Sequence, residues 1–183
     1  VINLSDGSLV QLLHKSEDLC LSAKFNLTGT RLATCGTDGS VRVFDSKTWQ
    51  EVVTFANHSN WVNDLAWSAD GNRIVTGSKD HSAKVFDLTT NSRISTYTGH
   101  DGGVYSVIFD ETGEHVLSAC SKGKVLYWRT ESGQAVKELA NQSESIYQIA
   151  ALDSAEHFIF SGAMPSVEMI DLQSGKKGKE FTS

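Results

Sequence analysis

A sequence unit recurs along this chain every 42 residues. Three of the copies carry a turn-like tetrapeptide that ends in glycine, with an aromatic residue directly before it. The glycines are Gly29, Gly71 and Gly113, and the aromatic residues are Phe25, Trp67 and Phe109. Four copies align without a gap over most of the 183 residues. A unit of this size cannot bury its apolar face alone, so the fold must be built by stacking neighbouring copies.

Within each copy the residue pattern predicts four short β-strands. After each glycine turn, a run rich in β-branched and other apolar residues forms a second strand, at 31–35, 73–77, 115–119 and 157–161. A tight turn and an alternating run follow, which indicates a third strand with unlike faces. Fourth strands end in an apolar residue at Phe55, Tyr97, Leu139 or Phe181, and first strands occupy 19–25, 61–67, 104–109 and 146–151. Helical repeats of similar period need apolar residues at helical spacing, so the alternation excludes them and predicts an all-β fold.

A period of 40 to 45 residues with four strands per copy is typical of the blades of a β-propeller. The repeat phase predicts blades at 16–57, 58–99, 100–141 and 142–183, within one domain that spans 1–183. Residues 1–15 align with the end of a preceding blade, which gives about 4.3 blades in all. We therefore expect part of a larger propeller of seven or eight blades. The remaining blades would come from the same parent chain, from a second copy through self-association, or from a different protein.

Particular dipeptides make the repeats resemble the WD-repeat (WD40) family over essentially the whole chain. Gly99 and His100 match the family's Gly-His pair, and Phe86 and Asp87 stand where its closing Trp-Asp pair stands. Trp128 keeps the tryptophan at that place in the next copy. The resemblance implies four-stranded antiparallel blades. It also implies a buried hydrogen-bond chain in each blade that joins an Asp, a His, a Ser or Thr and a Trp.

No copy carries all four residues of that chain. The second copy supplies His58, Thr76 and Asp80 but has Phe86 at the tryptophan position, so its chain should stop at Thr76 because a phenyl ring cannot donate. The third copy supplies His100, Ser118 and Trp128 but has Lys122 at the aspartate position. The first copy offers Asp38 and Thr34. We therefore expect apolar packing between blades to supply most of the stability.

Composition and charge exclude several classes of function. Sixteen basic residues against 22 acidic ones give a net charge of −6, which opposes general attraction to nucleic acid or anionic lipid. No apolar run approaches the roughly 20 residues that cross a bilayer. Three cysteines without paired spacing indicate reduced thiols and an intracellular protein. The chain shows no nucleophile elbow, phosphate-binding loop or metal-ligand spacing, so we expect no catalytic residues, no metal and no cofactor.

The expected function is therefore a non-catalytic scaffold or adaptor that binds other proteins or peptides. The alternative is a subunit of a ribonucleoprotein or chromatin assembly with direct nucleic-acid contact, which the acidic charge disfavours. In WD-repeat propellers, partners often bind the loops before the first strand and between the second and third strands. Trp61 is the strongest candidate there, because its counterparts Leu19, Gly103 and Ser145 show that the fold does not require an aromatic residue. The other predicted partner-binding residues are Asn60, Lys79, Tyr105 and Glu144.

Overall fold

The computed structural model describes residues 5–13, 18–152, 157–175 and 177–182, and in these ranges every regular element is a β-strand. Sixteen strands form four antiparallel sheets of four strands, each in chain order. The first sheet contains β1 (Cys20–Phe25), β2 (Arg31–Gly36), β3 (Ser40–Asp45) and β4 (Glu51–Ala56). The second contains β5 (Val62–Trp67), β6 (Arg73–Ser78), β7 (Ala83–Asp87) and β8 (Ser92–Tyr97). The third contains β9 (Val104–Phe109), β10 (His115–Cys120), β11 (Lys124–Arg129) and β12 (Ala135–Asn141), and the fourth β13 (Ile146–Ala151), β14 (His157–Gly162), β15 (Ser166–Asp171) and β16 (Lys177–Thr182).

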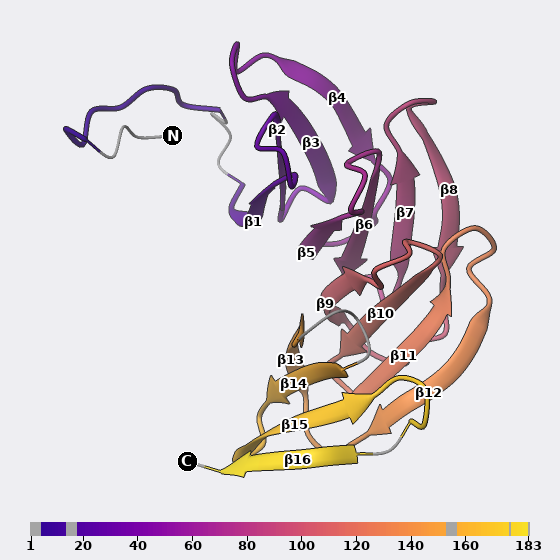
Figure 1. Cartoon of the computed structure of the whole chain (residues 1–183). Helices are drawn as coiled ribbons and strands as arrows, with labels where there is room; N and C mark the ends of the chain where they lie inside the picture. The colour runs from indigo at the N-terminus through magenta and orange to yellow at the C-terminus, as the bar shows by residue number, and fades with distance from the viewer. Residues whose placement is uncertain (1–4, 14–17, 153–156, 176, 183) are drawn as a thin grey trace.

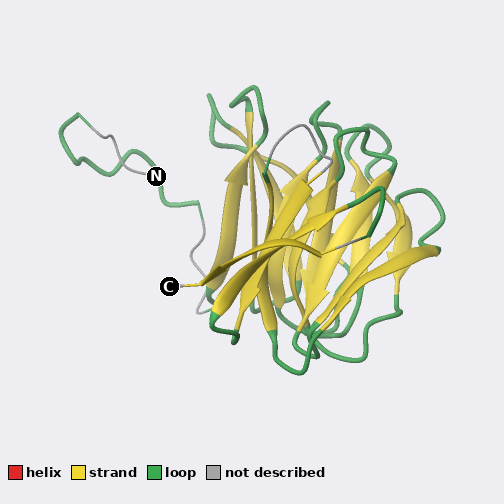
Figure 2. Ribbon diagram, turned by 60° about the horizontal axis from the view of Figure 1, so that its bottom comes forward, coloured by secondary structure: helices red, strands yellow, loops and turns green. Residues whose placement is uncertain are grey.

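The four sheets, here called blades 1 to 4, are arranged as an open arc (Figure 1). The first strands β1, β5, β9 and β13 lie along the inner, concave side, and the fourth strands lie on the outside. Turns gather at the two ends of the strands (Figure 2). The all-β propeller architecture expected from the repeat is confirmed, and the arc is a partial propeller that does not close.

Apolar cores hold consecutive blades together. Because side chains alternate along a strand, Val41 and Val43 of β3 point toward blade 2 and pack there against Leu65 and Phe86. Corresponding clusters join blade 2 to blade 3 and blade 3 to blade 4. At about 25 cal/mol per Å² of apolar surface, each large buried side chain contributes on the order of 2 kcal/mol to the free energy of folding.

The face of blade 1 that points away from blade 2 is open. Phe25 is 53% exposed there, whereas Leu65 in blade 2 is fully buried. A cavity of about 520 Å³ extends along this face and is lined by Leu19, Leu32 and Leu12 among others. Residues 5–13, which the repeat phase aligns with the end of a preceding blade, form no strand, because no neighbouring strand among the described residues pairs with them. They extend away from the sheets (Figure 1).

Candidate partner-binding site

The connections that enter the first strands and the turns between second and third strands lie at the same end of the arc, which we call the loop face. In blade 2 this face presents Asn60, Trp61 and Lys79. The indole of Trp61 is 43% exposed, and the Lys79 ammonium lies over it at 4.3 Å from the ring centroid. Desolvation by a partner would strengthen such a cation–π contact. The three predicted residues therefore form one exposed, partly apolar and positively charged group.

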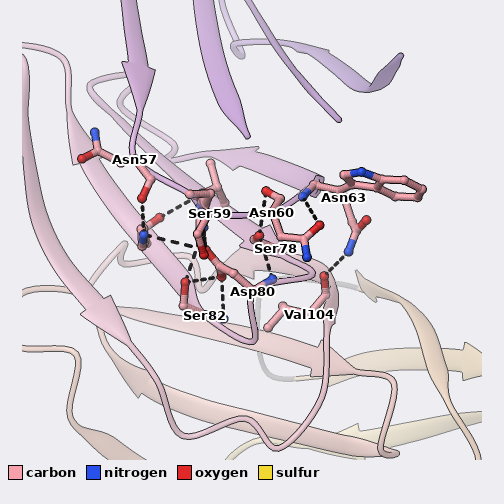
Figure 3. A network of polar contacts seen from close by, with 12 residues as sticks. Asn57, Ser59, Asn60, Asn63, Ser78, Asp80, Ser82 and Val104 are labelled. Carbon is pink, nitrogen blue, oxygen red and sulfur yellow. Dashed lines mark hydrogen bonds and ion pairs between the residues drawn. The ribbon is translucent and has the colours of Figure 1, made fainter. Parts of the chain in front are cut away.

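Backbone hydrogen bonds hold this group in place. The Lys79 amide donates to the Trp61 carbonyl at 2.8 Å, and the Trp61 amide donates to the Asn60 side-chain oxygen at 2.8 Å. The Ser78 hydroxyl donates to the Asn60 carbonyl at 3.2 Å (Figure 3). The indole is thus presented by an ordered backbone, which lowers the entropy lost when a partner binds.

Tyr105 and Glu144 lie apart from the group formed by Asn60, Trp61 and Lys79. The ring of Tyr105 packs against that of Tyr147 at a centroid distance of 5.6 Å, inside the arc. Both tyrosines line a polar cavity of about 210 Å³ together with Asn63 and Asp64. Glu144 is exposed in the connection between blades 3 and 4, and no contact among the described residues joins its side chain to Trp61 or Lys79. The structure therefore brings together three of the five predicted partner-binding residues and places the other two apart.

A buried polar network lies directly beneath the loop face of blade 2. His58 Nδ1 lies 2.8 Å from the Asp80 carboxylate, and its Nε2 lies 2.8 Å from the Thr76 hydroxyl. The Ser82 hydroxyl and the Ser59 amide also donate to Asp80, at 2.6 and 3.1 Å (Figure 3). Phe86 has no donor for the Thr76 hydroxyl, so the network does not extend to the third strand's aromatic residue. The Thr76 hydroxyl donates instead to the Lys84 carbonyl at 3.3 Å.

Ionisation in this network follows from burial and hydrogen bonding. Burial favours a neutral Asp80, but the hydrogen bonds from Ser82 and His58 outweigh it and lower the pKa of Asp80 to about 2. Burial also lowers the pKa of His58, against the opposing effect of Asp80. The Lys84 ammonium, 3.9 Å from Asp80, donates to the Asn57 carbonyl, which ties the entry to blade 2 to its third strand.

The network of blade 3 lacks its acid. His100 Nε2 lies 2.7 Å from the Ser118 hydroxyl, which also accepts a hydrogen bond from the Trp128 indole at 3.0 Å. The other ring nitrogen, Nδ1, is buried and has no hydrogen-bond partner among the residues that the structure describes. Lys122 occupies the position at which blade 2 has its aspartate, and its side chain is exposed. Burial lowers the pKa of His100 to about 4, so this ring is neutral near pH 7.

In blade 1, Asp38 binds Arg42 and Ser40 in place of a histidine. The Arg42 guanidinium lies 2.7 Å from the Asp38 carboxylate, and the Ser40 hydroxyl donates to it at 2.8 Å. Burial opposes ionisation, but these contacts hold the pKa of Asp38 below its ordinary value. Thr34 lines the open-face cavity beside them. The position equivalent to His58 in this blade falls outside the described residues.

Sequence reasoning missed a second polar system, centred on Asp64 of β5. Its carboxylate binds the Lys24 ammonium at 2.7 Å in blade 1 and accepts from the Ser106 hydroxyl and Val107 amide, both at 3.2 Å, in blade 3. Ser106 in turn accepts from the Ile149 amide of blade 4 at 3.2 Å. These contacts link all four inner strands. The sequence signal that could have revealed this system is a polar residue at one repeat position of otherwise apolar strands. The residues at that position are Ser22, Asp64, Ser106 and Gln148.

Metal-ligand spacing and thiol reactivity are two further properties of the described residues. Within those residues, no three His, Cys, Asp or Glu side chains gather at a spacing that would hold a metal ion. Cys35 and Cys120 are buried, and burial raises the pKa of the Cys35 thiol, which opposes formation of the reactive thiolate. Cys20 is exposed on the open face of blade 1. A search of the described residues finds no helix with the length and apolarity to cross a membrane.

An arc of four-stranded antiparallel blades, with inner strands joined by polar contacts and neighbouring blades joined by apolar cores, defines a protein of the β-propeller class. A sequence model of the WD domain, G-beta repeat (WD40), matches residues 7–45, 49–87 and 91–129, and the chain therefore belongs to the WD40 family. The match at 49–87 covers β4 to β7, so each sequence repeat supplies the last strand of one blade and the first three strands of the next. Comparison with curated proteins finds no match. WD40 repeats in general serve as protein-binding scaffolds rather than as enzymes.

Proposed function

We propose that this chain is a non-catalytic scaffold that binds a protein or peptide through the loop face of blade 2. The observation that carries the proposal is the exposed Trp61 ring held under Lys79 on an ordered backbone. Tryptophan is enriched among the residues that dominate binding energy, and Trp61 does not belong to the apolar cluster described between blades 1 and 2. Asn60 completes the group by fixing the Trp61 amide.

Quantitative capture of partners by the full chain tests the proposal. Trp61→Ala should reduce the amount of each loop-face partner by about tenfold or more, and Lys79→Ala should reduce it less. Val136→Ser is the matched control, because Val136 has a similar exposed fraction, 47%, but lies on the outer strand β12. Partners that bind the Trp61→Ala variant as well as the unsubstituted chain would remove Trp61 from the proposed site.

The nucleic-acid alternative predicts a different result. Direct contact with phosphates would give retention of RNA or DNA on a filter that falls steeply between low and moderate salt. The scaffold proposal expects no such retention by the isolated chain, since its net charge is −6. Salt-steep retention of nucleic acid that is lost in the Lys79→Ala variant would replace protein binding as the function of this face.

A further inference from the structure

The loop face continues from blade 2 onto blade 3 across the connection that enters β9. This connection contains Gly102 and Gly103, at the repeat positions where blade 2 has an asparagine and a tryptophan. A Cβ atom added at Gly103 would lie 3.4 Å from Cα of Lys79, and one added at Gly102 would lie 2.8 Å from Cγ of Lys122. The connection therefore runs between the two turns that carry these lysines, and at its two glycines it has no side chain that could cover them.

Lys79 and Lys122 have no acidic partner within the described residues. Both lysines are exposed, and none of the ion pairs formed by those residues involves either ammonium. The Lys79 ammonium lies over the Trp61 ring instead. The two positive charges are therefore available to a partner, next to an exposed aromatic ring.

The other charges at this end of blades 2 and 3 offset one another. Asp80 lies within the buried network, 3.9 Å from the Lys84 ammonium (Figure 3). Asp101 lies 3.1 Å from the Lys124 ammonium. The hydrogen bond with Asp101 raises the pKa of Lys124, and Glu138 of the outer strand β12 adds to this effect. Two unpaired cations thus remain on this surface, although the whole chain has a net charge of −6.

Acidic residues border this surface on both sides. Toward blade 4, a Cβ atom added at the glycine after Lys122 would lie 2.6 Å from the carbonyl oxygen of Glu144, whose residue is exposed. Toward blade 1 are Asp18 and Asp38, and Arg42 binds the second of these at 2.7 Å. The unpaired positive charge is therefore confined to blades 2 and 3.

We infer that the partner of the loop face is an acidic peptide segment that carries a bulky apolar residue among its carboxylates. This inference rests on the proposed function and names the chemistry of its partner. Carboxylates at Lys79 and Lys122 would form the ion pairs that the chain's own acids do not form, and the apolar side chain would pack on the Trp61 ring. A nucleic acid fits less well, because its affinity comes from many phosphate contacts and only two lysines are unpaired here.

Synthetic peptides test this chemistry. The probe is fluorescein-labelled Asp-Glu-Leu-Phe-Glu-Asp with an amidated C-terminus, titrated with the full chain and followed by fluorescence anisotropy. At low salt we expect it to bind at least about fivefold more tightly than the uncharged peptide Asn-Gln-Leu-Phe-Gln-Asn, with a smaller difference at high salt. It should also bind at least about fivefold more tightly than the peptide with Ser-Gly in place of Leu-Phe. Equal binding of either comparison peptide, or no binding of the probe, overturns the inference.

Substitutions in the protein locate the binding. Lys122→Asp should weaken the binding of the probe by about fivefold or more, and Lys79→Ala by about threefold. Glu144→Gln should strengthen it by about twofold, because it removes a carboxylate that repels the peptide. Lys47→Asp is the matched control, since Lys47 is exposed in the turn between β3 and β4 at the opposite end of the strands. Unchanged affinity in both lysine variants of the loop face, or weaker binding by Glu144→Gln, overturns the inference.

The outcomes separate this inference from the proposed function. Partner capture that is lost in Trp61→Ala but unchanged in Lys122→Asp, together with equal binding of the acidic and uncharged peptides, would keep the scaffold proposal and overturn the acidic chemistry. Partner capture that Trp61→Ala leaves unchanged would overturn the proposed function itself. Release of the probe by a single-stranded oligonucleotide at a lower concentration than by unlabelled peptide would assign the surface to nucleic acid and overturn the inference.

Discussion

Lys122 occupies the repeat position at which blade 2 has Asp80. This difference decides whether the Nδ1 atom of the buried histidine in each blade has a hydrogen-bond partner. In blade 2 the carboxylate lies 2.8 Å from Nδ1 of His58, whereas the corresponding nitrogen of His100 has no hydrogen-bond partner in the described part of the chain. The Ser118 hydroxyl accepts from Trp128 and is free to donate to Nε2 of His100. In that arrangement Nδ1 of His100 carries the proton, and an unpaired buried donor costs about 1–3 kcal/mol.

Replacing Lys122 with aspartate should therefore stabilise the protein. We expect Lys122→Asp to raise the free energy of unfolding by about 1 kcal/mol, because the carboxylate would accept from Nδ1 of His100 as Asp80 does for His58. Urea denaturation of the variant measures this change. Lys122→Ala is the control, since it removes the lysine without adding an acceptor. Equal stability of the two variants would show that the new carboxylate does not reach the ring.

The buried histidine also makes stability depend on pH. Burial lowers the pKa of His100 from 6.5 to about 4, so between these values the unfolded chain binds a proton that the folded chain does not. The free energy of unfolding should therefore decrease as the pH falls from about 6.5 to about 4, by about 3 kcal/mol from this residue. The lowered pKa of His58 acts in the same direction. The stabilisation that Asp80 provides is lost only as the pH falls below its ordinary pKa of 3.8.

Urea denaturation at pH 7 and pH 5 measures this dependence. His100→Gln should reduce the difference in unfolding free energy between the two pH values, because glutamine does not titrate. Lys122→Asp should reduce it too, since a nearby carboxylate favours the protonated imidazole and raises its pKa. A pH difference that is the same in all three proteins would show that His100 is not the titrating group.

The turn between the second and third strands keeps one backbone conformation in blades 1 to 3, although its residues differ. Gly39, His81 and Gly123 occupy the same repeat position and have φ values of 75°, 69° and 74°. This left-handed conformation favours glycine, and histidine adopts it at a cost. A Cβ atom added at Gly123 would also lie 2.2 Å from the backbone carbonyl oxygen of Gln142, which a side-chain rotation cannot relieve.

Substitutions at this turn should therefore have opposite signs. Gly123→Ala should lower the free energy of unfolding by about 2 kcal/mol or more, through backbone strain and the clash with Gln142. His81→Gly should raise it by about 0.5 kcal/mol, because relief of the strained φ exceeds the added entropy of the unfolded chain. Thermal or urea unfolding of both variants gives the two values. A destabilised His81→Gly variant would mean that the histidine side chain makes contacts worth more than its strain.

At the scale of the whole molecule, the repeat predicts the fold better than it predicts the contacts between blades. The interval between Phe25, Trp67 and Phe109 is enough to place the first strands, since strand position depends on local alternation and turn residues. The contact of Asp64 with Lys24 and Ser106 depends on how far one sheet is twisted against the next, which a one-dimensional pattern does not contain.

For the candidate binding site, too, the sequence predicted individual residues better than the contacts between them. Trp61 stood out because its repeat counterparts are not aromatic, and the loop position of Lys79 followed from the turn pattern. Their contact at 4.3 Å required knowledge of which turn lies beside which connection. Nothing in the sequence indicated that Phe25, Trp67 and Phe109 line a common cavity of about 610 Å³, because the repeat does not contain the way the blades curve toward one another. Phe25 at 53% exposure shows why one repeat position does not imply one environment.

Stacked blades stabilise one another through nearest-neighbour contacts, so the cost of a substitution should depend on which face it lies on. Leu65 is fully buried between blades 1 and 2, while Phe25 lies on the open face of blade 1 and is 53% exposed. Leu65→Ala should lower the free energy of unfolding by about 2–4 kcal/mol, and Phe25→Ala, although it removes a larger side chain, by less than about 1 kcal/mol.

Urea denaturation of the two variants, at protein concentrations from micromolar to tens of micromolar, tests this comparison. A cost for Phe25→Ala close to that of Leu65→Ala would show that the open face is covered in solution. If that cost grew with protein concentration, the cover would be a second copy of the chain, since association stabilises the folded state by mass action. A small, concentration-independent cost is the result expected if this face of blade 1 is uncovered, because the phenyl ring of Phe25 then buries little apolar surface on folding and its truncation loses little.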